Sequence, residues 1–141
     1  MRNAERYPFT VANSALGEAG LQPYLPLILT YQGHSLTVPS LLDTGAMVNV
    51  LPYQVGVDLG AAWEQQTAPL RLTGNLASFE ARGLLVTAVV GQFAPVRLAF
   101  AWTKATNVPV LLGQVNFFMQ FDACFYRSQL AFELRPKEES T

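Results

Sequence analysis

The chain has 141 residues, of which 50% are apolar and only 13% are charged. This length suits one globular domain with a substantial core, and so little charge favours a chain whose apolar surface meets a partner. The nine basic residues are scattered and the net charge is −1, which excludes the clustered basic face that nucleic-acid binding requires.

Short apolar runs, rich in β-branched and aromatic residues, predict an all-β domain with two short helices. In chain order we expect strands at 7–11, 24–31, 35–42, 70–73, 79–90, 93–102 and 129–134. The connections at 32–34 and 74–78 predict two hairpins, because their glycines tolerate positive φ. Pro52 and Gly60 predict a helix over 52–59, and a second helix is expected over 114–120, after Gly113.

Asp43 lies where an apolar strand ends, directly after Leu41 and Leu42. A carboxylate in this position loses solvation, which favours its neutral form. Backbone N–H groups around Gly45 and the Thr44 hydroxyl are available to compensate, because glycine permits close approach. The turn is therefore a candidate functional site, with an ordinary Asp-initiated turn as the alternative.

Two motifs give this turn its context. Residues 41–52, Leu-Leu-Asp-Thr-Gly-Ala-Met-Val-Asn-Val-Leu-Pro, resemble the active-site segment of retropepsin-like aspartic proteases. Residues 110–114, Val-Leu-Leu-Gly-Gln, resemble the second signature of that family, two apolar residues and a glycine before a helix near the C-terminus. The resemblance covers 24–134 and implies a retropepsin-like acid protease fold that homodimerisation closes.

The resemblance also implies roles for the residues of the turn. Asp43 matches the catalytic aspartate, and Thr44 matches the threonine whose hydroxyl reaches across the dimer axis. Gly45 and Ala46 complete the turn that supports the carboxylate. Met47 departs from the pattern, because cellular members often carry Ser or Thr here, and a thioether donates no hydrogen bond.

Two further segments take roles from the resemblance. The loop behind the turn corresponds to Leu111, Leu112 and Gly113. The flap that closes over a bound peptide corresponds to Leu72, Thr73, Gly74, Asn75 and Leu76. Gly74 is expected at the flap tip.

Aspartic-protease chemistry needs two carboxylates that share one proton, and the chain holds a single Asp-Thr-Gly. We therefore expect a homodimer with a twofold axis, in which Asp43 meets Asp43 of the partner subunit and the pair activates a water to cleave peptide or protein substrates. The apolar segments 9–11 and 130–134 are expected to interleave at the interface. The alternative is a dimer of the same fold that binds peptides or serves assembly without cleaving them.

By this reading, residues 1–20 form an N-terminal arm with an interface strand, 21–135 the protease domain, and 136–141 a polar tail that frays. His34 in a predicted turn and Cys124 in an apolar run leave too few ligands for a metal site, and we expect no cofactor. Asp58 and Asp122 are expected to be solvated. The sequence shows neither a signal peptide nor an apolar stretch of about 18 residues, so a cytoplasmic setting away from membranes is expected.

Overall fold

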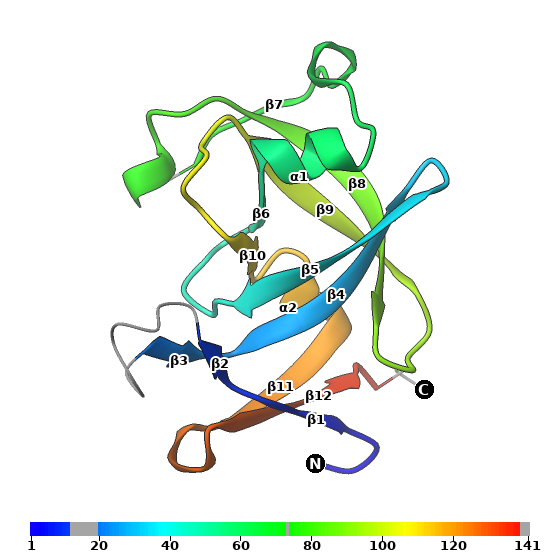
Figure 1. Ribbon diagram of the computed structural model, residues 1–141, viewed down its shortest axis with the longest axis vertical. Coiled ribbons are helices and arrows are strands. Elements are labelled where there is room, and N and C mark those ends of the chain that lie inside the picture. The colour runs from blue at the N-terminus through cyan, green and yellow to red at the C-terminus, as the bar shows by residue number, and fades with distance from the viewer. Residues whose placement is uncertain (12–19, 73, 139–141) are drawn as a thin grey trace.

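The computed structural model describes residues 1–11, 20–72 and 74–138. Its architecture is mostly β with two short helices, which confirms the predicted class (Figure 1). The strands and helices are β1 (Glu5–Pro8), β2 (Thr10–Val11), β3 (Leu21–Gln22), β4 (Tyr24–Tyr31), β5 (His34–Leu42), β6 (Asn49–Pro52), α1 (Tyr53–Asp58), β7 (Pro69–Leu70), β8 (Ala81–Val90), β9 (Val96–Thr103), β10 (Val110–Leu112), α2 (Phe117–Gln120), β11 (Phe121–Tyr126) and β12 (Ala131–Pro136). Three 3-10 turns add η2 (Trp63–Gln65), η3 (Gly74–Leu76) and η4 (Arg127–Gln129).

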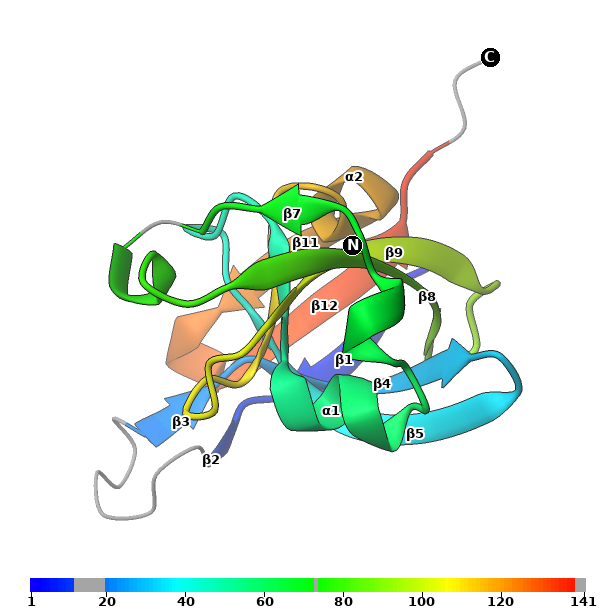
Figure 2. The ribbon, with the colours of Figure 1, turned by 90° about the horizontal axis from the view of Figure 1, so that it is seen from above.

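The main sheet closes on itself to form a barrel. Its seven strands run in the order β4-β5-β10-β6-β9-β8-β7, and an additional pairing of β4 with β8 joins the two sides. The pairs β5–β10 and β6–β9 are parallel, whereas the hairpins β4–β5 and β8–β9 are antiparallel. The loop end of the β7–β8 hairpin, with η3, and the loop between β9 and β10 lie on the same side of the barrel, at the left of Figures 1 and 2.

The core fills the barrel with large apolar side chains. Leu25, Leu27 and Leu29 of β4 are fully buried, and they alternate with exposed neighbours because successive side chains of a strand point to opposite faces. Trp102 of β9 is also fully buried and donates from its indole N–H to the Tyr53 carbonyl oxygen over 3.0 Å. This contact fixes α1 against the barrel.

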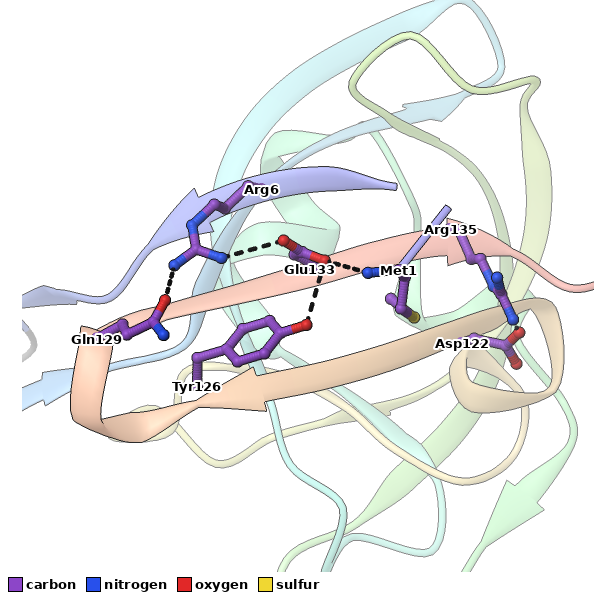
Figure 3. A network of polar contacts seen from close by, with 7 residues as sticks. All are labelled: Met1, Arg6, Asp122, Tyr126, Gln129, Glu133 and Arg135. Carbon is purple, nitrogen blue, oxygen red and sulfur yellow. Dashed lines mark hydrogen bonds and ion pairs between the residues drawn. The ribbon is translucent and has the colours of Figure 1, made fainter. Parts of the chain in front are cut away.

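A separate sheet in the order β1-β12-β11 carries the two ends of the chain. Phe132 and Leu134 of β12 are fully buried in the core of their own chain. On the polar side, Glu133 accepts hydrogen bonds from the Met1 amine and Arg6, which also contacts Gln129 (Figure 3). Within the described residues β12 is paired on both sides, with β1 and with β11, so its own edges are already occupied. The interleaving expected for 9–11 and 130–134 stays a prediction.

Both predicted hairpins are confirmed as β4–β5 and β7–β8, and Gly33 turns the first with φ 84°. The first helix, predicted over 52–59, is present as α1 at Tyr53–Asp58. The strand expected over 7–11 is divided into β1 and β2, and the last strand is displaced to Ala131–Pro136. The tail expected to fray was 136–141, but Pro136 is paired with Phe121 as the last residue of β12. Residues 139–141 of the tail and 12–19 of the arm lie outside the described residues.

Four strands were not predicted: β3, β6, β10 and β11. β6 and β10 are four and three residues long, too short for alternation to show, and every residue of β6 is buried. The second helix was predicted to begin at 114 and begins instead at Phe117. No helix among the described residues has both the length and the apolar character needed to cross a bilayer.

Candidate active site

Asp43 follows the last residue of β5, and β10 holds it in place. Parallel pairing sets Leu41 beside Leu111 and Leu42 beside Leu112. The pairing continues into the turn, where the Asp43 N–H donates to the Leu112 carbonyl oxygen over 2.9 Å. The two sequence motifs therefore lie side by side, on the neighbouring parallel strands β5 and β10.

The Asp43 turn (residues 43–46) is closed by its own hydrogen bonds. The Gly45 N–H donates to Asp43 Oδ1 over 3.0 Å, and the Ala46 N–H donates to the Asp43 carbonyl oxygen over 3.1 Å. Asp43 is partly buried, and Thr44 and Gly45 are exposed. Among the described residues Asp43 Oδ2 has no hydrogen-bond donor, so the turn holds the carboxylate through Oδ1 alone.

Gly113 and Gln114 support the turn from behind. A Cβ at Gly113 would lie 2.6 Å from the Val48 carbonyl oxygen and 2.7 Å from that of Ala46, a spacing that only glycine allows. The Gln114 N–H donates to the Ala46 oxygen over 2.9 Å, and Gln114 Nε2 donates to the Thr44 oxygen over 2.8 Å. Leu112 and Gly113 are buried here and do not line the cleft.

Asn49 is a supporting residue that the sequence reasoning missed. Its side chain is fully buried; Oδ1 accepts from the Gly113 N–H over 2.8 Å, and Nδ2 donates to the Ala99 carbonyl oxygen and to Asn116 Oδ1. Asn116 Nδ2 in turn donates to the Arg97 carbonyl oxygen over 3.1 Å. The available signal was an amide within an apolar run, because a buried polar side chain requires partners.

A cleft of about 410 Å³ opens beside Asp43. Most of its lining is apolar. It is formed by Asp43, Gly45, Ala46, Met47, Val48, Val50, Arg71, Leu72, Leu76, Val108, Pro109 and Leu111. The structure thus brings the acid of the first motif together with residues of the β7–β8 hairpin and of the segment around β10.

Three of the other predicted site residues do not line the cleft: Thr44, Gly74 and Asn75. Thr44 is an exposed residue of the Asp43 turn. Gly74 begins η3 with φ 63°, and Asn75 follows it in the same turn. Thr73 lies outside the described residues. The cleft residues Val48, Val50, Arg71, Val108 and Pro109 were missed, although all of them neighbour the motifs or the hairpin in sequence.

Other reactive side chains lie away from this cleft. His34 is exposed in the β4–β5 hairpin, and Cys124 is a free, half-buried thiol in β11. Asp58 accepts from Gln54 at the surface, and the exposed Asp122 pairs with Arg135 over 3.2 Å. In the described part of the chain, no three His, Cys, Asp or Glu side chains gather as metal ligands.

The sequence matches no protein-family model and no curated protein. Its structure is similar to the crystal structure of a retropepsin-like aspartic protease from Rickettsia conorii, with a TM-score of 0.62 and 14% sequence identity. The likeness covers 93% of this chain and 90% of the other. The chain therefore has the retropepsin-like fold that its motifs predicted, and at this identity the likeness shows the fold alone.

Proposed function

We propose that the protein is an aspartic endopeptidase in which Asp43 works with Asp43 of the partner subunit. The observation that carries this proposal is the carboxylate itself. It follows a barrel strand, is held through Oδ1 by the Gly45 N–H over 3.0 Å, and borders an apolar cleft. The likeness to a retropepsin-like aspartic protease supports the same reading.

The proposed chemistry depends on two carboxylates that share one proton. Like charges about 3 Å apart do not both ionise, so one acid stays protonated and the other stays ionised. The ionised carboxylate takes a proton from a trapped water, which attacks the peptide carbonyl carbon. The protonated carboxyl donates its proton to the carbonyl oxygen.

A dimer is proposed because one chain supplies one half of this machinery. Thr44 is an exposed residue of the Asp43 turn. Two exposed apolar side chains belong to the same region: Met47, directly after the turn, is 66% exposed, and Val115 is 49% exposed. The backbones of these two residues are joined, because the Val115 N–H donates to the Met47 oxygen over 2.9 Å. Apolar surface beside an unpaired half-site favours contact with a second copy.

The test compares cleavage of a mixed peptide library at mildly acidic pH by the wild type and by Asp43→Asn. The amide keeps the size of the side chain and removes the acid, so we expect activity to fall by about a thousandfold or more. The matched control is Asp58→Asn, an exposed aspartate on α1 outside the cleft, which should cleave like the wild type. Equal activity of Asp43→Asn and wild type, or no cleavage by either, would contradict the proposal.

The alternative is a dimer that binds peptides, or serves assembly, without cleaving them. Met47 favours it, because an exposed thioether lines the cleft and offers no hydrogen-bond donor to a peptide or to the acid. In that case the wild type would not cleave, and Asp43→Asn would bind peptides as tightly as the wild type does.

A further inference from the structure

The cleft contains one positive charge that the proposed reaction does not use. Asp43 and Arg71 are the charged residues among those that line it, and the other lining residues are apolar or glycine. Arg71 follows β7 directly and precedes Leu72, so the β7–β8 hairpin carries it to the cleft. Its side chain is exposed, and the dyad chemistry gives it no role.

No carboxylate of the described residues lies within ion-pair distance of Arg71, whereas Arg6 and Arg82 each have one such partner and Arg135 has two. Glu80 is the candidate nearest to the end of the β7–β8 pairing, because Leu70 pairs with Ala81, and Arg71 and Glu80 are the residues that follow this pair. The Glu80 carboxylate is instead 4.0 Å from Arg82 Nη2, and its side chain is 73% exposed. The guanidinium thus remains available to a ligand in the cleft.

We propose that Arg71 determines specificity by binding an aspartate or glutamate side chain of an extended peptide substrate. This inference rests on the proposed function and adds a substrate class to it: peptides with apolar residues at the cut and acidic residues flanking them. A guanidinium binds a carboxylate through two parallel, charge-assisted hydrogen bonds. The pair forms at an apolar cleft, where fewer water molecules screen the two charges than in bulk water.

Twofold symmetry sharpens this expectation. Two copies of Arg71 contribute two positive charges, while a dyad that shares one proton contributes a single negative charge. The joined cleft is then cationic overall, with one arginine on each side of the scissile bond. The preferred substrate therefore carries an acidic residue on each side of the scissile bond. A peptide with one acidic residue gains about half of the binding free energy that two acidic residues provide.

The experiment uses a set of fluorogenic peptides with one apolar core. The flanking positions carry Glu, Gln or Lys on one side or on both. Values of kcat/KM are measured for the full-length wild type, Arg71→Gln and Arg71→Glu, and Kd values are measured for the same peptides with Asp43→Asn. For the wild type we expect about a tenfold preference for a Glu peptide over its Gln counterpart, which weakens as salt is added.

Arg71→Gln should abolish this preference, and Arg71→Glu should shift it to the Lys peptides. The matched control is Arg97→Gln, which removes the same charge from an exposed side chain on β9 outside the cleft and should keep the preference for Glu. An equal loss in Arg97→Gln would show an effect of net charge and would overturn the assignment.

The outcomes separate this inference from the proposed function. Cleavage by the wild type without a preference for Glu overturns the role of Arg71 and leaves the endopeptidase standing. Tighter binding of Glu peptides by Asp43→Asn, with no cleavage by the wild type, supports Arg71 and overturns the endopeptidase. If the wild type cleaves no peptide and Asp43→Asn binds none, both the role of Arg71 and the endopeptidase are overturned.

Discussion

Gly113 sets how closely the segment behind the active site approaches the Asp43 turn. In Gly113→Ala the new Cβ would lie 2.6 Å from the Val48 oxygen and 2.7 Å from the Ala46 oxygen. Both contacts are with backbone, so the turn has to move to admit a methyl group. We expect Gly113→Ala to lower the free energy of unfolding by about 1–3 kcal/mol, measured in urea, and to lower kcat/KM as the carboxylate shifts.

A matched glycine offers the control for this substitution. A Cβ at Gly83 in β8 would lie 3.6 Å from the Ala68 Cβ, an ordinary contact, and its φ is not positive. Gly83→Ala should therefore change the free energy of unfolding by less than about 1 kcal/mol. Equal stability of the two variants would show that the close approach at Gly113 does not constrain the fold.

Among single residues, those of the two motifs could be predicted from the sequence, whereas the residues that hydrogen-bond to them could not. Asp43 and Gly113 stand in short patterns that the sequence displays directly. The structural role of Asn49 depends on its hydrogen bonds with Gly113 and Asn116, which are far from it in sequence. Arg71 is likewise one of several isolated arginines until the hairpin brings it to the cleft. Residues whose role depends on long-range contact leave little trace in a single sequence.

At the scale of elements, Glu133 ties β1 to β12. Its carboxylate accepts hydrogen bonds from the Met1 amine over 2.8 Å and from Arg6 over 3.0 Å (Figure 3). These two donors, the amine first, hold the pKa of Glu133 below its ordinary value. A lowered pKa in the folded state means that the stabilisation is complete above the unfolded value, about 4.3, and is lost as the pH falls through the folded one.

We therefore expect Glu133→Gln to lower the Tm at pH 7 and to differ less and less from the wild type as the pH falls below about 4. Thermal unfolding, followed across a pH series, measures the difference. Glu64→Gln, an exposed glutamate in η2 away from the terminal sheet, serves as the control and should follow the wild type at every pH. A constant difference between Glu133→Gln and wild type would rule out the linkage.

The elements also show why strand and helix boundaries escaped prediction. The hairpins were visible because turn residues such as Gly33 interrupt long strands. The helix expected over 114–120 starts late because Val115 forms a parallel β-bridge with Val48. The Val115 carbonyl oxygen accepts from the Asn49 N–H instead of from an N–H of the next helical turn. β10 could not be predicted as a strand, because its three residues are all apolar and are too few to show a periodic pattern.

For the whole molecule, the single chain presents a closed barrel and, under the proposed function, one half of the active site. The barrel closes through β4 and β8 without help from another chain. The cleft, by contrast, is bordered by one carboxylate and one β7–β8 hairpin. The proposed activity therefore depends on protein concentration, because the fraction of paired subunits falls on dilution.

Thr44 provides the test at this scale. Gln114 Nε2 holds its carbonyl oxygen, so Thr44→Ala removes the hydroxyl and leaves the backbone supported. If each subunit's hydroxyl makes one bond across the axis, two bonds of about 1 kcal/mol each are lost, and the dimer Kd rises by tenfold or more, about 1.4 kcal/mol per decade. Sedimentation over a dilution series measures that Kd. Thr44→Ser keeps the hydroxyl and should dimerise like the wild type; the same Kd for Thr44→Ala would mean that no such bond joins the subunits.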